Sequence, residues 1–281
     1  MYKILIDSCG DLSPEQKKDP RIVSIPLTLE VNGEQIIDDE TFDQKSFLEK
    51  VAASPTCPKS ACPSPDSYMT AMEGPEEHVY VVTLTSNLSG SYNSAVLGKE
   101  LYEEEHLDDD NKKIYVFDSR SACVGETLIA MKVMELEEQG LSFEEVVEQT
   151  EKYIEGQNTY FVLDNLDSLR KNGRLTGIKA VVAARLKIKP VMKATEIGTI
   201  QQLDQALGTA KALDCMLKYL QNELKDPENK VVGITHCNCP ERALLLKEKI
   251  ERIGKFKAIH IVDSAGVASL YASDGGVVVV V

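Results

Sequence analysis

The sequence predicts an α/β fold of two domains. We expect the first domain to be a three-layer α/β/α unit with a mainly parallel sheet, and the second to be an α+β unit with a mixed or antiparallel sheet. Short runs rich in Val, Ile and Tyr alternate with helical periods of about 10–15 residues, which is typical of sheets covered by helices. The chain has 281 residues, about twice the length of an average domain.

The elements follow one another in a regular order. Strands are expected at the apolar runs of residues 2–6, 23–30, 79–84, 114–117, 160–163, 231–235, 258–262 and 277–281. Helices are expected over residues 43–53, 91–105, 127–139, 142–156, 208–224 and 240–254. A hairpin is expected around Gly198, and a long acidic helix ends at Gly156. We therefore predict domains at residues 1–155 and 156–281.

The charge of the chain is unevenly distributed. Lys and Arg number 31 and Asp and Glu number 45, which gives a net charge of −14 at pH 7. Eight cations and no acid fall within residues 170–193, here called the basic block, which leaves 23 cations against 45 acids elsewhere. Nucleic-acid binding is not expected, because it depends on cations that replace counterions. An anion or an acidic partner is expected at the basic block.

The ends and the cysteines predict a cytoplasmic protein. The N-terminal residues lack the charged and apolar regions of a signal peptide, and no apolar run approaches the roughly 20 residues of a membrane span. Seven cysteines, an odd number, favour a reducing compartment. His236, Cys237 and Cys239 suggest a metal, but no second cysteine pair supplies the remaining ligands of a structural zinc site. We interpret this segment as a reduced loop.

Four of the predicted strands end in an aspartate, namely Asp7, Asp118, Asp164 and Asp263. Ligands of α/β sheets bind beyond the carboxyl ends of the strands, so these side chains are candidates for one shared crevice. Capping of the following helix is the simpler explanation for any single one of them.

A hydroxyl-rich turn at residues 85–92 is more informative. It reads Thr-Ser-Asn-Leu-Ser-Gly-Ser-Tyr and lies between a predicted strand and a predicted helix. Backbone N–H groups and the positive end of the helix favour an anion there, which makes Ser86, Ser89 and Gly90 candidate ligand-binding residues. No Lys follows the Gly, so the turn is not a phosphate-binding loop of the Gly-Lys-Ser/Thr kind.

Two other segments supply candidate ligand-binding residues. Ser60 lies in the Pro-rich segment 57–65, which three prolines hold extended and rigid. Arg170 and Arg174 flank a turn at Gly173, and two guanidinium groups there suit capture of a carboxylate or a phosphate. The alternative for this basic segment is a surface that docks an acidic partner or the other domain.

The histidines do not predict a catalytic trio. His236, which ends a predicted strand, is the only one of the four in a ligand-like position. No Ser or Cys is fixed against it by spacing, so hydrolysis by a triad has weak support.

Taken together, these motifs resemble those of the DegV family of bacterial fatty-acid-binding proteins. Residues 7–12, Asp-Ser-Cys-Gly-Asp-Leu, are similar to the family's Asp-Ser-x-x-Asp-Leu. The segments around Ser60 and Ser89 resemble its Thr-Ser-Gln-Pro-Ser loop and its Leu-Ser-Gly motif. Residues 169–174 match its Leu-Arg-Lys-x-Gly-Arg, and residues 186–191 match its Lys-Pro strand. The joint order of these blocks makes the resemblance specific.

The resemblance implies an apolar ligand tunnel between the two domains. It implies a long-chain fatty acid in that tunnel, with its carboxylate held by Ser60 and Ser89. It also implies a carrier that is not itself an enzyme, needs no cofactor or metal, and in several members presents its acyl chain to a fatty-acid kinase subunit. The resemblance implies a bound fatty acid such as a C16–C18 chain. A chain of that length supplies most of its own affinity, because each buried methylene contributes about 0.8 kcal/mol.

The sequence departs from the family pattern at several places, among them the following two. Cys62 stands where the family has Gln, and Ser273 to Gly276 replace a motif that contains His near the head group. Two other functions stay open, one because of the clustered hydroxyls and His236, and the other because of the basic block. The first is a hydrolase or transferase that acts on a small anionic substrate through a Ser of the same crevice. The second is a docking protein that binds an acidic partner through the basic block.

Overall fold

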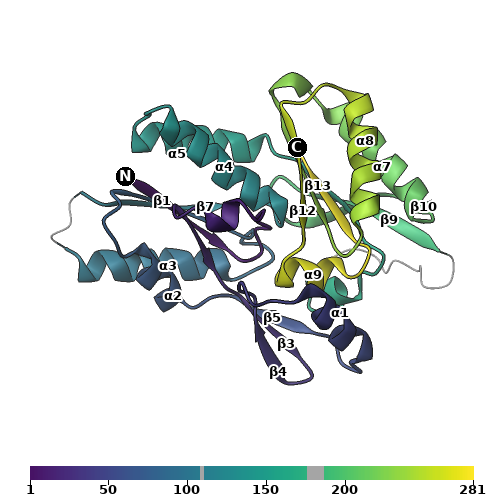
Figure 1. Ribbon diagram of the computed structural model, residues 1–281, viewed down its shortest axis with the longest axis horizontal. Helices are drawn as coiled ribbons and strands as arrows, with labels where there is room; N and C mark the ends of the chain where they lie inside the picture. The colour runs from purple at the N-terminus through teal and green to yellow at the C-terminus, as the bar shows by residue number, and fades with distance from the viewer. Residues whose placement is uncertain (108–110, 176–186) are drawn as a thin grey trace.

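The computed structural model describes residues 1–107, 111–175 and 187–281, and these residues form three sheets (Figure 1). The first sheet is parallel throughout, with the order β2-β1-β6-β7. Its strands are β1 (Tyr2–Asp7), β2 (Ile22–Ile25), β6 (His78–Thr83) and β7 (Lys113–Asp118). This sheet confirms the mainly parallel arrangement predicted for the first half of the chain.

Helices cover both faces of the first sheet, because successive side chains of a strand point to opposite faces. One face packs against α2 (Pro65–Met72) and α3 (Ser91–Glu105). The other face packs against α4 (Val124–Glu138) and α5 (Phe143–Glu155). The first domain is therefore the predicted three-layer α/β/α unit.

The second sheet is mixed and has the order β10-β9-β8-β13-β11-β12. Its strands are β8 (Thr159–Val162), β9 (Ile188–Ala194), β10 (Ile200–Leu207), β11 (Val231–His236), β12 (Ala258–Asp263) and β13 (Val277–Val280). The β11–β12 pair is parallel and the other pairs in the described residues are antiparallel. This confirms the mixed sheet predicted for the second domain, and β9 and β10 form the predicted hairpin around Gly198.

The two faces of the second sheet have different neighbours. One face packs against α7 (Thr209–Glu223) and α8 (Pro240–Ile253). The other face packs against α9 (Gly266–Ala272) and against α4, which also covers the first sheet. The two domains consequently meet over an apolar layer.

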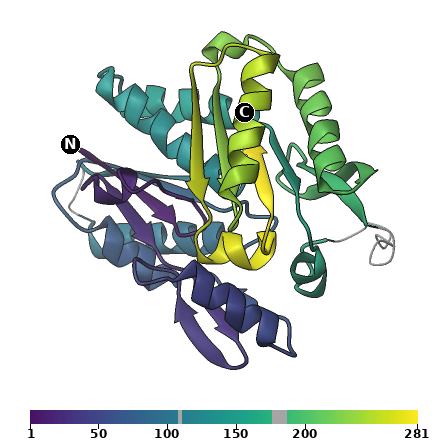
Figure 2. The ribbon, with the colours of Figure 1, turned by 45° about the vertical axis from the view of Figure 1, so that its right-hand side comes forward.

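A small antiparallel sheet projects below this layer, with the order β4-β3-β5 (Figure 2). Its strands are β3 (Thr28–Val31), β4 (Glu34–Ile37) and β5 (Lys59–Ala61). The helix α1 (Gln44–Ala53) and the helix α9 share an apolar cluster with β3. The small sheet thus brings a segment of the first domain against the second.

The remaining described helices are short. They are α6 (Asp167–Lys171) and two 3-10 turns at Gln16–Lys18 and Pro227–Asn229. Among the described residues, no helix combines the length and the apolar character that crossing a bilayer requires.

The structure corrects the predicted elements at several points. The single strand predicted over residues 23–30 is wrong, because β2 ends at Ile25 and β3 belongs to the small sheet. Pro26 has no N–H to donate to a strand ladder, so pairing with β1 ends there. The helix α4 begins at Val124, three residues before the predicted start at Thr127. The strands β4 and β5 and the helix α9 were not predicted.

Candidate ligand-binding site

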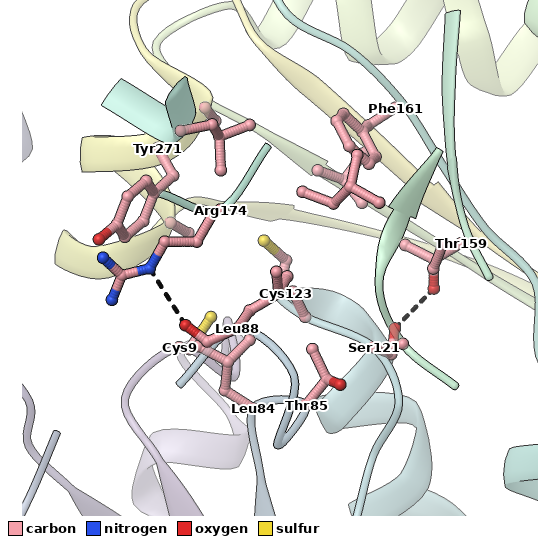
Figure 3. A pocket seen from close by; sticks show the side chains of 18 of the residues that line it. Cys9, Leu84, Thr85, Leu88, Ser121, Cys123, Thr159, Phe161, Arg174 and Tyr271 are labelled. Carbon is pink, nitrogen blue, oxygen red and sulfur yellow. Dashed lines mark hydrogen bonds between the residues drawn. The ribbon is translucent and has the colours of Figure 1, made fainter. Parts of the chain in front are cut away.

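A pocket lies where the second sheet and α9 face the loops that follow β1, β6 and β7 (Figure 3). Its empty volume is about 730 Å³, open space at its mouth included. Most of its wall is apolar and includes Leu84, Phe161, Ile200, Ala268 and Val278. Small-molecule pockets are mostly apolar with a few placed polar groups. The pocket therefore suits an apolar ligand.

Arg174 and Tyr271 line one end of this pocket, which we call the mouth because both side chains are only half-buried. The Arg174 guanidinium lies 5.4 Å from the centre of the Tyr271 ring. Its Nε donates to the carbonyl of Leu88 at 3.1 Å, and its Nη1 donates to the carbonyl of Asn172 at 2.8 Å. These partners are neutral carbonyls, and no carboxylate among the described residues pairs with Arg174, so its positive charge is uncompensated there. The mouth is therefore suited to an anion.

Ser60 reaches the mouth from β5 in the small sheet. Its Oγ lies 2.9 Å from Oη of Tyr271. Burial raises the pKa of the Tyr271 phenol, while the Ser60 hydrogen bond and the Arg174 charge act in the opposite direction. The phenol is therefore protonated at neutral pH. Because one of the two hydroxyl protons is used in the bond between Ser60 and Tyr271, the other remains to be donated to a ligand oxygen.

In the hydroxyl-rich turn, some residues form hydrogen bonds within the protein and others line the pocket. The Ser86 Oγ donates to Asp118 at 2.5 Å, and the Ser86 backbone N–H donates to the same carboxylate at 3.0 Å. The Ser89 Oγ donates to Ser91 Oγ at 3.1 Å and accepts from the Ser91 N–H at 3.1 Å, at the start of α3. These bonds shape the turn itself, whereas Thr85 and Leu88 of the same turn line the pocket.

Gly90 permits a close approach between this turn and the Pro-rich segment. A Cβ atom at Gly90 would lie 3.0 Å from Sγ of Cys62. The absence of a side chain there lets the strand that carries Ser60 approach the start of α3. Gly90 therefore influences the position of Ser60 at the mouth through this close packing.

The basic block divides between the mouth and the surface. The Arg170 side chain is 60% exposed and pairs with Asp167 at 3.0 Å. Lys189 pairs with Asp164 at 2.8 Å, away from the pocket. Within the described part of the basic block, Arg174 lines the pocket and Arg170 does not. Lys179 and Arg185 lie outside the described residues.

The four aspartates at strand ends do not line the pocket. Asp7 is fully buried and accepts from the N–H groups of Cys9 and Leu84 at 3.1 and 2.9 Å. Asp118 accepts a hydrogen bond from the Ser86 hydroxyl, and Asp164 forms ion pairs with Lys189 and Arg242. Asp263 accepts from the Gln44 side chain at 2.8 Å. The prediction of one shared crevice is wrong, because these carboxylates fix separate loops.

Two buried carboxylates of the first domain hold the N-terminus of α9. Asp38 accepts from the N–H groups of Gly266 at 2.7 Å and of Val267 at 2.8 Å. Asp11 accepts from the N–H of Ala265 at 2.7 Å. It also accepts from the hydroxyl of Thr235, in β11 of the second domain, at 2.8 Å. Burial raises the pKa of Asp11 to about 7 and that of Asp38 to about 6. These bonds satisfy helix N–H groups that have no partner inside the helix.

The helix α9, and with it the position of Tyr271, does not follow from the sequence pattern. The helix has seven residues, which is too short for a helical period to be recognised. A signal was present, because Asp263 and Ser264 end a strand and residues of this type often precede a helix.

His236 lies apart from the hydroxyl-rich turn. Its Nδ1 is 3.3 Å from the Asp263 carboxylate, and burial lowers the pKa of the imidazole. Among the described residues, no hydroxyl or thiol forms a hydrogen bond with the imidazole ring. The structure therefore offers no nucleophile paired with this histidine.

Comparisons with known proteins agree with this architecture. The DegV family model matches residues 1–281. A DegV domain-containing protein of Streptococcus pneumoniae is 38% identical over 277 residues, which cover 98% of this chain and 96% of the relative.

Two solved structures cover all of this chain. A DegV family protein from Ruminococcus gnavus, refined with vaccenic acid, has a TM-score of 0.96 at 49% identity over 99% of its own chain. The Fatty Acid Kinase (Fak) B3 protein of Streptococcus pneumoniae, loaded with linoleic acid, has a TM-score of 0.90 at 36% identity over 98% of its chain. The family match over the whole length and the shared two-domain fold lead to one conclusion: this chain belongs to the DegV family.

Proposed function

We propose that this protein binds a long-chain fatty acid, with its acyl chain in the pocket and its carboxylate at the mouth. The observation that carries the proposal is an apolar pocket of about 730 Å³ with the uncompensated guanidinium of Arg174 at one end. The fatty acids held by the similar proteins of Ruminococcus gnavus and Streptococcus pneumoniae support it.

The chemistry of the mouth suits a carboxylate. Arg174 supplies charge, and the hydroxyl pair of Ser60 and Tyr271 supplies a hydrogen-bond donor in the same place. Ser89 lies next to Leu88, whose carbonyl holds Arg174. Such charge-assisted hydrogen bonds are stronger than neutral ones. A C16–C18 chain supplies most of the remaining affinity at about 0.8 kcal/mol per buried methylene, and no cofactor is needed.

We further propose that the protein is a carrier which presents its fatty acid to a fatty-acid kinase subunit. The similarity to the Fatty Acid Kinase (Fak) B3 protein supports this role. The hydrolase or transferase hypothesis has less support, because the Ser89 hydroxyl bonds to Ser91 and His236 has no paired nucleophile among the described residues.

We also propose a boundary between the two domains and a cellular compartment for the protein. A boundary between residues 155 and 156 is supported by the end of α5 at Glu155 and by the start of the second sheet at Thr159. A cytoplasmic location is supported by the odd number of cysteines.

Lipid extraction from natively purified protein tests the proposal. Mass spectrometry is expected to detect a fatty acid at about one per chain, and added fatty acid is expected to raise the Tm of delipidated protein. Recovery of no acyl species, together with an unchanged Tm, would contradict the proposal. Labelling of Ser89 by an acylating electrophile, with loss of a hydrolytic activity in Ser89→Ala, would favour the enzyme hypothesis instead.

A further inference from the structure

We propose that Asp38 is a positioning residue for fatty-acid binding, because it fixes the short helix α9 and thereby places Tyr271 at the mouth. This inference rests on the proposed function, since it takes the carboxylate of the fatty acid to lie beside Tyr271. It also gives a role to the segment Asp-Ser-Cys-Gly-Asp-Leu at residues 7–12, of which Cys9 alone lines the pocket.

The start of α9 is bound to the first domain, although β12 and β13 on either side of it belong to the second sheet. Asp38 Oδ1 accepts from the N–H of Gly266 at 2.7 Å, and Asp38 Oδ2 accepts from the N–H of Val267 at 2.8 Å. Asp11 Oδ1 accepts from the N–H of Ala265 at 2.7 Å. Three successive N–H groups of the second domain therefore end on two buried carboxyl groups of the first.

Ser8 of the same N-terminal segment orients the Asp38 carboxyl group. The Ser8 Oγ donates to Asp38 Oδ2 at 2.9 Å and accepts from the N–H of Leu27 at 3.0 Å. On the other side of Asp38, a Cβ atom at Gly266 would lie only 2.6 Å from Oδ1, so the helix start touches the carboxyl group directly. Asp38 is thus held between Ser8 and the helix and has little freedom to move.

Other contacts fix α9 to the first domain in the same direction. Gln44, at the start of α1, donates through Nε2 to Asp263 Oδ1 at 2.8 Å and to the carbonyl of Ser264 at 2.9 Å. Val267 and Leu270 pack in an apolar cluster with side chains of β3 and α1. The position of the helix start therefore follows that of the first domain.

The position of the helix start in turn determines that of Tyr271, because α9 has only seven residues. Tyr271 lies about 7.5 Å from Gly266 along the helix axis, at 1.5 Å per residue. Its Oη lies 2.9 Å from Ser60 Oγ, and its ring lies beside the guanidinium of Arg174 (Figure 3). A shift of the helix by about 1 Å away from Ser60 would lengthen the bond beyond the limit of about 3.5 Å for a hydrogen bond. Asp38 is thus coupled to the polar groups of the mouth without lining the pocket itself.

A double-mutant cycle on delipidated protein tests this inference, with the affinities for a fatty acid and for its methyl ester measured by isothermal titration. Tyr271→Phe removes the phenol and should weaken binding of the acid roughly three- to tenfold. In Asp38→Asn an NH₂ group replaces one of the two accepting oxygens, so this variant should show a comparable loss for the acid and little change for the ester. The double variant should bind the acid no more weakly than Tyr271→Phe alone, because the residue that Asp38 positions is already altered.

The matched control is Asp39→Asn, because the Asp39 side chain accepts from Thr41 and, in the described part of the chain, forms no hydrogen bond with α9. This variant should keep the wild-type affinities for acid and ester. If Asp38→Asn does not fold, Ser8→Ala, which removes the hydroxyl that donates to Asp38, should weaken binding of the acid at least twofold and leave binding of the ester unchanged. Wild-type affinity for the acid in Ser8→Ala would then overturn the inference.

Three results of the cycle would overturn the inference while leaving the proposed function intact. The first is wild-type affinity for the acid in Asp38→Asn or in Tyr271→Phe. The second is a loss in Asp38→Asn that is equal for acid and ester, which would indicate a general change of the pocket. The third is a double variant in which the two losses multiply, since Asp38 would then act independently of Tyr271. A wild-type protein that binds neither acid nor ester would contradict both the inference and the proposed function.

Discussion

The hydroxyls of Ser60 and Tyr271 lie 2.9 Å apart and join the small sheet of the first domain to α9 of the second at the pocket mouth. The Tyr271 ring also lies beneath the guanidinium of Arg174. One hydrogen bond therefore aligns the polar groups that would meet a carboxylate.

Ser60→Ala should weaken fatty-acid binding roughly tenfold, because it removes one hydrogen bond to a charged group. Isothermal titration of delipidated protein measures the change. Ser54→Ala is the control, since Ser54 bonds to Asn32 and Thr56 at the end of α1 and does not line the pocket. Equal affinities of the Ser60→Ala variant and the wild type would exclude Ser60 from carboxylate binding.

Arg174→Gln should weaken binding of a fatty acid roughly ten- to hundredfold, because a bond to a charged partner is lost. Binding of the methyl ester of the same acid should change little, because the ester has no charge. Arg170→Gln is the matched control, since Arg170 is exposed and paired with Asp167. A loss of affinity that is equal for acid and ester would show that Arg174 acts only through packing.

The buried carboxyls that hold α9 predict a pH dependence of stability. The pKa of Asp38 is raised from 3.8 to about 6, and that of Asp11 is raised to about 7. Between about pH 4 and these values the folded state binds protons that the unfolded state releases. The stabilisation is therefore present at low pH and is lost as the pH rises through the folded pKa values.

Between pH 5.0 and pH 7.5, Asp38→Asn should reduce this loss of stability by about 1.4 kcal/mol, because about one unit of the pKa shift lies above pH 5.0 and each unit is worth about 1.36 kcal/mol. Urea unfolding at pH 5.0 and pH 7.5, two test conditions chosen on either side of about 6, provides the measurement. Asp39→Asn is the control, because the pKa of Asp39 is lowered and its titration falls below this interval. If the stability of Asp38→Asn showed the same pH dependence as that of the wild type, the assignment of this pH dependence to Asp38 would be refuted.

Gly198→Ala should destabilise the protein by roughly 2–5 kcal/mol. The backbone φ of +78° costs about 1–2 kcal/mol for a residue with a Cβ, and the Cβ would also meet Thr85 and Arg120. Gly140→Ala is the matched control, because its φ is +75° and nothing lies within 4 Å of its Cβ position. Chemical denaturation should show the larger loss for Gly198→Ala, and equal losses would mean that the hairpin yields to the new methyl group.

Much of the fold could be predicted from the sequence, because its long elements carry clear periods. The apolar run of β6 and the capped acidic helix α5, where Ser142 and Glu145 form a capping box, need only local information. The separation of β2 from β3 depends on Pro26, whose effect on pairing was overlooked. The helix α9 is too short and too buried to show an amphipathic pattern.

The site was less predictable than the fold, because its residues come from distant parts of the chain. Arg170 and Arg174 look equivalent in the sequence, yet one pairs with Asp167 on the surface and the other lies over Tyr271. Ser86 resembles a ligand-binding residue until the carboxylate of Asp118 is seen to engage it. Tertiary partners decide such roles, and sequence spacing does not reveal them.

The position of β13 has a consequence for biosynthesis. Residues 277–280 are made after every other strand of the second sheet, yet they pair with β8 on one side and with β11 on the other. The β8–β9–β10 part and the β11–β12 part of this sheet therefore cannot be joined until β13 has left the ribosome. Val278 of the same strand also forms part of the pocket wall. The wall of the pocket is therefore complete only after residues 277–280 have been synthesised and have paired with both neighbouring strands.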